Sequence, residues 1–143
     1  MSVQRAACAI FCASVALHRN AWDTQVVYSP EVLDHYKHPR NVGELEDATV
    51  KVEVSNPVCG DTLILAVRVE AGRIAAVRFR TRGCPPAIAS SSLLTELLAG
   101  KTVAEIRGIT AQQISDALGG LPPATHHASQ LAEDAVDVLV DRL

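Results

Sequence analysis

One stretch decides the fold: RGCPPAIASSS, residues 82–92, where a strand pattern gives way to an apolar helix. Gly83 allows a sharp turn, and Pro85 and Pro86 suit the first helical positions because their φ is fixed and they need no N–H partner. Cys84 is therefore expected at a helix N-terminus. Unpaired backbone N–H groups and the positive end of the helix dipole favour a thiolate there, the form that binds metal or attacks sulfur. The alternative is a small buried cysteine at a turn.

Three segments before this stretch alternate between apolar and polar residues with the period of two that is typical of half-buried strands. They are residues 48–54, 63–69 and 74–82, and a tight turn at residues 70–73 joins the last two. Strands in hairpin succession predict a three-stranded antiparallel meander with one apolar face.

The rest of the pattern is helical. Ser29 is the expected N-cap of a first helix, which must stop at His38 because Pro39 disfavours helical geometry in the residue before it. Later helical signals are an apolar stripe ending near Gly100, N-caps at Thr102 and Thr110, and a last helix over residues 127–142. The predicted fold class is α+β, an antiparallel meander packed against helices in two layers.

The chain has 143 residues, enough for one domain with a single core, and we expect that domain to span residues 28–143. Residues 1–27 are interpreted as a leader outside the fold. Within them, residues 6–17 form a short apolar run that is similar to a weak signal-peptide core. Cys8 and Cys12, four residues apart, could share a metal, although a disordered leader or sequence ahead of the functional start explains the segment better.

Composition excludes several classes of function. A net charge of -3 with cations scattered along the sequence argues against nucleic-acid binding, and no apolar run is long enough to cross a bilayer. The four cysteines are not spaced as the disulfides of a small secreted domain, which favours a reducing, cytoplasmic location and a role in metal or sulfur chemistry. No Ser/His/Asp arrangement or recognisably spaced pair of acids indicates a hydrolase, and we expect no enzymatic activity.

Three separate segments each offer a metal ligand at the boundary of an element. Cys59 and Asp61 share one face of an extended segment, Cys84 ends the third strand, and His126 or His127 begins the last helix. Two sulfurs, one carboxylate and one imidazole suit zinc or ferrous iron, and thiolate with imidazole also holds [2Fe–2S] clusters. The alternative is that the histidines are merely polar residues at a helix start and Asp61 is a turn carboxylate.

At this point the sequence resembles the IscU/NifU-type iron–sulfur cluster assembly scaffolds, from Tyr28 to about Leu143. The resemblance is carried by several motifs in order: YSPEVLDHY at 28–36, PRNVG at 39–43, CGD at 59–61, GC at 83–84 with AIASSS at 87–92, LPP at 121–123 and LAEDA at 131–135. It implies an IscU/NifU-like fold and a scaffold that holds iron, zinc or a nascent [2Fe–2S] cluster. It also implies two kinds of partner, a cysteine desulfurase that supplies persulfide sulfur and apo-proteins that receive the cluster.

One departure from the family pattern is consequential. The family's third cysteine follows a histidine in His-Cys-Ser, whereas this chain has Ala128 between His127 and Ser129. By resemblance the ligands that carry over are Cys59, Asp61, Cys84 and His127. The lysine after the double proline, part of the site for an Hsp70-type chaperone in the family, is also missing, so a chaperone partner is in question.

Three functions stay open on this evidence. The leading one is a cluster scaffold or carrier, in which Asp61 is the exchangeable ligand that permits release. The second is a zinc-binding accessory or regulatory protein of a cysteine desulfurase that does not itself assemble clusters. The third is a sulfur relay in which Cys84 accepts a persulfide.

Overall fold

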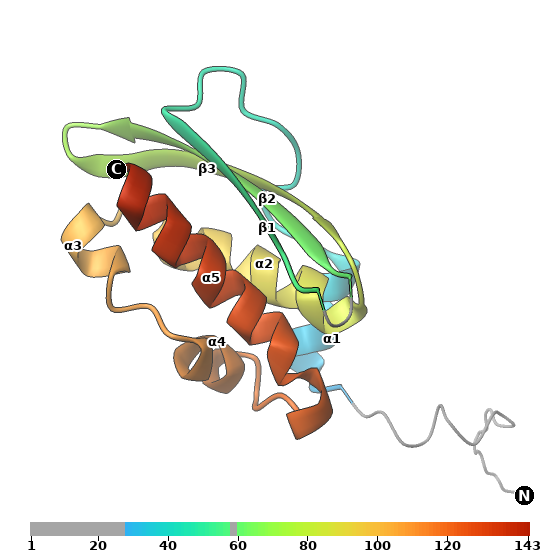
Figure 1. The fold of residues 1–143 in the computed structure, drawn as a ribbon. Helices are drawn as coiled ribbons and strands as arrows, with labels where there is room; N and C mark the ends of the chain where they lie inside the picture. Colours follow the sequence, from blue (N-terminus) through green and yellow to red (C-terminus); the bar gives the residue numbers. More distant parts are fainter. Residues whose placement is uncertain (1–27, 58–59) are drawn as a thin grey trace, which may run out of the picture.

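The computed structural model describes residues 28–57 and 60–143, and Figure 1 shows their arrangement. Cys8, Cys12, Cys59 and the predicted leader lie outside the described residues. The elements are, in chain order, α1 (Pro30–Lys37), β1 (Val50–Ser55), β2 (Thr62–Glu70), β3 (Arg73–Arg82), α2 (Pro85–Leu98), α3 (Val103–Ile106), α4 (Ala111–Ala117), a 3-10 turn (Pro123–Thr125) and α5 (His126–Arg142). The predicted α+β class is confirmed.

The three strands form one antiparallel sheet in the order β1-β2-β3. Its inner face carries cross-strand rows of apolar side chains, such as Val52 opposite Leu65 opposite Phe79, all buried. The β2–β3 hairpin turns through Ala71 and Gly72, both with positive φ, a geometry typical of a tight hairpin. The alternation read from the sequence therefore corresponds to one buried and one open face.

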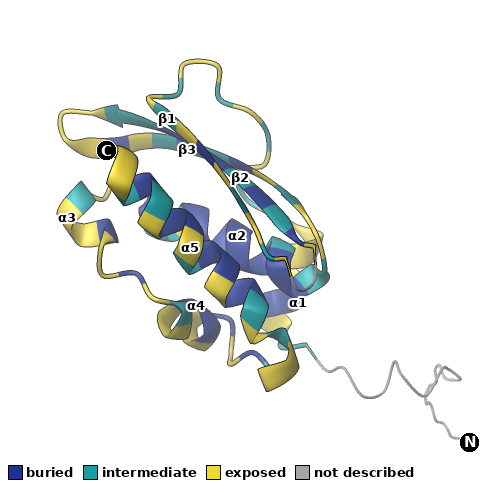
Figure 2. Cartoon of the chain, viewed as in Figure 1, coloured by how far each residue is buried: buried dark blue, intermediate teal, exposed yellow. Residues whose placement is uncertain are grey.

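Helices α2 and α5 pack on the inner face of the sheet, so the molecule has two layers (Figure 1). Figure 2 shows α2 buried along most of its length, whereas α5 alternates between buried and exposed turns. The core between the layers includes Leu94 and Leu98 of α2 and Leu131 and Leu139 of α5, all essentially inaccessible. Each such side chain contributes roughly 1.5–3 kcal/mol relative to an exposed one.

The helix starts follow the local signals. Ser29 accepts the backbone N–H of Val32 at the start of α1, and Thr110 caps α4 in the same way. Thr102 and Glu105 form a reciprocal capping box at α3. After α4 the chain is extended at Pro122, and a 3-10 turn that begins at Pro123 leads into α5.

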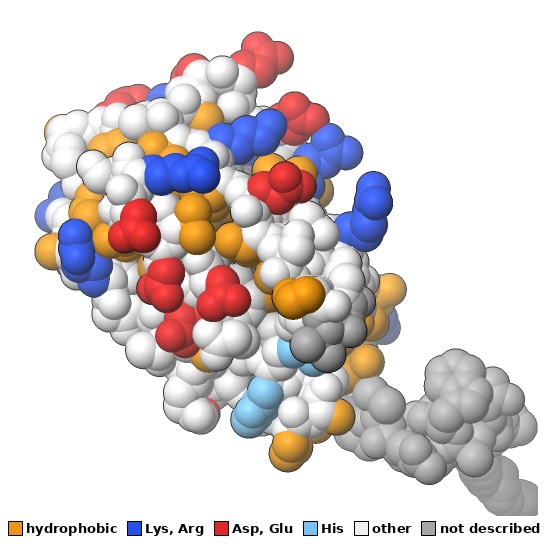
Figure 3. Space-filling model, viewed as in Figure 1, with side chains coloured by type: hydrophobic (Ala, Val, Ile, Leu, Met, Phe, Trp, Pro, Cys, Tyr) orange, Lys and Arg blue, Asp and Glu red, His pale blue; other side chains and the backbone are white. Residues whose placement is uncertain are grey.

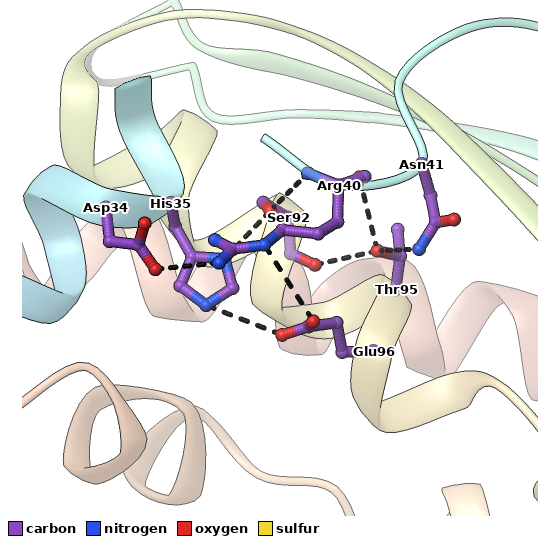
Figure 4. Close-up of polar contacts among 7 residues, drawn as sticks. All are labelled: Asp34, His35, Arg40, Asn41, Ser92, Thr95 and Glu96. Carbon is purple, nitrogen blue, oxygen red and sulfur yellow. Dashed lines mark hydrogen bonds and ion pairs between the residues drawn. The ribbon is translucent and has the colours of Figure 1, made fainter. Parts of the chain in front are cut away.

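A polar network fastens α1 and the segment after it to α2 (Figure 4). The Ser92 hydroxyl lies 2.8 Å from His35 Nδ1 and accepts the backbone N–H of Arg40 at 2.9 Å, and Asn41 Nδ2 donates to Thr95 Oγ1 at 3.0 Å. The serine run of α2, unfavourable for a helix by propensity, is buried. The small side chains let neighbouring elements approach closely, and the hydroxyls of Ser91 and Ser92 bond to those elements.

Within the described ranges, no helix has both the length and the apolar composition needed to span a bilayer.

Candidate metal centre

The loop between β1 and β2 presents Asp61 at the edge of the sheet. Two backbone hydrogen bonds close the loop, from Gly60 N–H to Asn56 O at 2.7 Å and from Asn56 N–H to Asp61 O at 2.8 Å. Gly60 has φ +76, a conformation that glycine adopts without steric cost. Asp61 immediately precedes β2 and is almost fully buried, with 4% of its surface exposed.

Cys84 is the N-cap residue of α2, as the double proline predicted. Its backbone is extended, with φ -72 and ψ 164, and Pro85 and Pro86 occupy the first helical positions. Its side chain makes no capping hydrogen bond to the helix, so the sulfur is directed elsewhere. A sulfur at the positive end of a 14-residue helix is well placed to act as a thiolate ligand.

His127 completes the group from the first turn of α5. Its Nε2 lies 3.7 Å from Cys84 Sγ and 3.5 Å from Asp61 Oδ2, and the sulfur lies 3.5 Å from the same carboxylate oxygen. Three elements that are distant in sequence thus bring a thiol, a carboxylate and an imidazole within 4.8 Å of one another.

These separations fit a single metal ion. Tetrahedral ligands at the usual Zn–S, Zn–N and Zn–O distances lie about 3.4–3.6 Å apart. The observed spacings of 3.5 to 3.7 Å lie within about 0.1 Å of that range. A buried carboxylate beside a sulfur is also expensive unless a cation or proton compensates it. The donor set therefore suits zinc or iron.

The site requires a residue without a side chain at Gly83. A Cβ atom there would lie 2.5 Å from Asp61 Oδ1 and 2.7 Å from Asp61 Cγ, well inside contact distance. Gly83 therefore does more than permit the turn expected from the sequence. It makes room for the carboxylate between β2 and the start of α2.

The structure distinguishes between the two neighbouring histidines. His126 Nε2 lies 2.9 Å from the backbone oxygen of Leu121, so its ring fastens the link that precedes α5. His127, in contrast, faces Asp61 and Cys84. Ala128, at the position where the resemblance led us to expect a cysteine, is 1% exposed and packs in the apolar core.

Tyr28, the first residue of the YSPEVLDHY motif, was not predicted to interact with the site. It packs against the edge of the core. Burial raises its pKa, and the nearby negative charges of Cys84 and Tyr36 raise it further.

Comparison with known proteins places the chain in a family. The model of the NifU-like N-terminal domain matches residues 27–142. The chain belongs to this family. It is 47% identical over 110 residues to the iron-sulfur cluster assembly scaffold protein IscU 1 of Archaeoglobus fulgidus, an alignment that covers 77% of this chain and 72% of the relative. The IscU scaffold protein of Azotobacter vinelandii is 45% identical over 119 residues, covering 80% and 92%.

Solved structures of family members share the fold. A crystal structure described as a putative iron-sulfur cluster assembly scaffold protein for the SUF system, from Fervidobacterium islandicum, superposes with a TM-score of 0.54 at 25% identity, covering 80% of this chain and 87% of that one. The N-terminal part of a NifU-like protein from Brucella abortus superposes with a TM-score of 0.56 at 18% identity, covering 80% and 81%. The likeness to the Brucella protein concerns the fold alone.

Proposed function

We propose that this protein is an iron–sulfur cluster assembly scaffold or carrier, which binds iron or a [2Fe–2S] cluster as cargo and passes it to apo-proteins. The observation that carries the proposal is the convergence of Asp61, Cys84 and His127 within 4.8 Å, in a chain about 45% identical to proteins named as such scaffolds. In this role the protein holds and transfers its cargo and is not an enzyme. A cysteine desulfurase would supply the sulfur.

The ligands would have unequal roles. Cys84 offers a soft thiolate, which binds iron and zinc strongly, and the neutral ring of His127 binds through Nε2. Asp61 is the hard ligand of the set and the weakest partner for iron bound to sulfide, so its departure would open the site for transfer. Cys59, outside the described residues, is the fourth ligand by resemblance.

The buried alanine at position 128 favours a second candidate. With two thiols in place of three, the donor set holds zinc as readily as an assembling cluster. In that case the protein would be a zinc-binding accessory or regulatory protein of a cysteine desulfurase.

A sulfur relay through Cys84 would leave a persulfide on that residue, detectable by mass spectrometry after incubation with desulfurase and cysteine.

Anaerobic reconstitution with ferrous iron and sulfide tests the leading proposal. We expect visible charge-transfer absorbance from the wild type and its loss in Cys84→Ser and His127→Ala. The matched control is His126→Gln, which keeps a donor for the Leu121 carbonyl and should load normally. A wild type that develops no chromophore but binds one zinc per chain would exclude the scaffold and favour the accessory protein.

A further inference from the structure

The outer face of the sheet, opposite the helices, carries an ordered set of cations. Strand register places three rows of side chains on this face, which are Ser55 with Thr62 and Arg82, Glu53 with Ile64 and Arg80, and Lys51 with Ala66 and Arg78. Every second residue of β3 from Arg78 to Arg82 is thus an arginine on the same face. Figure 3, viewed from the side of α5, shows acidic side chains over that helix and both basic and acidic side chains over the sheet.

Most of these cations have no carboxylate partner. Arg80 pairs with Glu44 at 2.6 Å, but Arg78 donates to Asn41 and to the Val77 carbonyl. Within residues 28–57 and 60–143, no carboxylate lies within ion-pair distance of Lys51, Arg78 or Arg82. Arg142, at the end of α5, donates to the Lys51 carbonyl at 3.1 Å and adds a fifth charge to the rim.

The face is therefore locally positive on a chain whose net charge is -3. On the three rows and their border, five cations (Lys51, Arg78, Arg80, Arg82 and Arg142) stand against two carboxylates, Glu44 and Glu53. Beyond these rows Arg68 is matched by its own partners, Asp47 and Glu70. Like charges held on one rigid surface repel each other. A partner protein with a negatively charged surface would offset that repulsion, and the attraction between the two surfaces would speed its association.

The positive face is also hollowed. A depression of about 450 Å³ is lined by Glu53, Thr62, Ile64 and residues 80–82. A second depression, of about 510 Å³, shares Glu53 and Ile64 and extends to Arg142. Ile64 thus forms an apolar centre within a charged rim, the usual anatomy of a protein interface. Ala66, in contrast, is buried beside Gly43, Glu44 and Leu45, so the open part of the face is the end nearer the metal centre.

We propose that this end of the sheet's outer face is a docking surface for an acidic protein that delivers cargo to, or takes cargo from, the candidate metal centre. Thr62 directly follows Asp61, and Arg82 lies two residues before Cys84, so a partner seated on this row reaches the mouth of the site. The docking follows from shape and charge. The exchange of cargo rests on the proposed function.

Other occupants fit the face less well. Nucleic acid would meet Glu44 and Glu53 among the cations and, on the three rows, no aromatic side chain to stack on. A second copy of this chain could offer the acids of α5, such as Asp134 and Asp137. That arrangement would appear as a concentration-dependent dimer and is one outcome of the test below.

Calorimetric titration with a holo plant-type ferredoxin tests the docking. This small acidic probe already carries its cluster, so binding is measured without transfer. We expect Arg80→Glu/Arg82→Glu to weaken binding at least about tenfold, because like charges are then opposed at the interface. Binding by the wild type should also weaken as ionic strength rises from about 0.05 to 0.3 M, because salt screens exposed charges. The control, Lys101→Glu/Arg107→Glu, makes the same charge change at exposed positions around α3 and should bind within about twofold of the wild type.

In NMR spectra of the full-length chain, the amide signals of Thr62, Ile64 and Arg82 should shift when the ferredoxin is added. Both double variants should keep the wild-type melting temperature. Absence of wild-type binding, an equal loss in both variants, or a wild-type dimer abolished by Arg80→Glu/Arg82→Glu would each overturn the proposal. Metal loading of the same variants, measured separately, should be unchanged. A failure of the proposed function is thereby distinguished from a failure of docking.

Discussion

At the residue scale, the candidate metal centre depends on the missing side chain of Gly83 as much as on the side chains that surround it. Gly83 leaves the space that the Asp61 carboxylate fills, and Asp61 in turn reaches both Cys84 and His127. Three ligands can have suitable chemistry and still fail to bind one ion if a neighbouring atom displaces one of them by an ångström. Geometry at this scale is therefore set by packing around the ligands.

The variant Gly83→Ala tests that dependence. The added methyl would collide with Asp61 and move its carboxylate, so we expect zinc affinity to fall by roughly 10-fold to 100-fold, the usual cost of disturbing a ligand's support. A titration against a chromogenic chelator measures the change. Gly108→Ala is the control, because a Cβ there would meet its nearest neighbour at an ordinary 3.6 Å. Equal affinities in the two variants would contradict the prediction.

His35 is a second residue whose environment has a measurable consequence. It is buried between α1 and α2, with Ser92 at Nδ1 and Glu96 Oε1 at 3.5 Å from Nε2. Burial lowers its pKa, as does the charge of Arg40, while Glu96 and Asp34 act in the opposite direction. In the neutral tautomer whose proton is on Nε2, on the side of Glu96, Nδ1 accepts the Ser92 hydroxyl proton. A protonated ring would take away that acceptor.

We expect His35 to make stability depend on pH. The unfolded chain protonates this ring near its ordinary pKa of about 6.5, whereas the folded chain does so only at lower pH. Between those two values the unfolded state binds more protons, so the free energy of unfolding falls as pH decreases below about 6.5. Urea unfolding at several pH values should show this slope, and His35→Asn should flatten it. His38→Asn, at an exposed position, should leave it in place.

At the scale of elements, the contact between α1 and the end of α4 fixes how the chain enters the fold. The Ser29 hydroxyl, which caps α1, also donates to the Leu118 carbonyl at the end of α4. Gly119 follows with φ +81, and a Cβ there would lie 2.8 Å from Glu31 Oε1 and 2.9 Å from Ser29 Cβ. Ser29 thus caps α1 and also contacts the end of α4.

A pair of glycine variants separates backbone strain from this contact. Gly120 has φ +87 but open space around a Cβ, so Gly120→Ala should cost about 1 kcal/mol from backbone conformation alone. Gly119→Ala should cost at least about 1 kcal/mol more, because it also pushes Ser29 and Glu31 away. Denaturant unfolding measures both. A smaller loss for Gly119→Ala than for Gly120→Ala would show that the α1–α4 contact is loose.

At the scale of the whole molecule, the candidate ligands come from the start of β2, the N-terminus of α2 and the first turn of α5. The unfolded chain cannot hold them together, so a metal bound to all three binds the folded state selectively. Metal binding should therefore be linked to global stability rather than to one loop.

We expect zinc to raise the melting temperature of the wild type. At a free concentration 100 times Kd the stabilisation is about 2.7 kcal/mol. Chelation should reverse it, and Cys84→Ser should respond far less, while His126→Gln should behave as the wild type does. Scanning calorimetry with and without zinc provides the measurement. A wild-type melting temperature indifferent to zinc would argue against a shared ion.

The sequence by itself determined the features that depend on near neighbours along the chain. Helix starts at Ser29, Thr102 and Thr110, the three alternating strands and the position of Cys84 at a helix N-terminus all follow from local signals, and the structure agrees with them. Such signals are readable because caps, prolines and side-chain alternation act over a few residues. The resemblance to the family then indicated which residues of the chain are candidate ligands.

Only the tertiary structure decided what lies together. It placed His127 beside Asp61 and Cys84 and His126 beside the Leu121 carbonyl, and it brought three candidate ligand atoms within 4.8 Å of one another. It also gave Gly83 its role beside Asp61. It also collected cations that are scattered in the sequence onto one face, since strand register aligns residues that the chain separates by tens of positions. The physical reason is the same in each case: these distances are set by packing between elements, which no local pattern encodes.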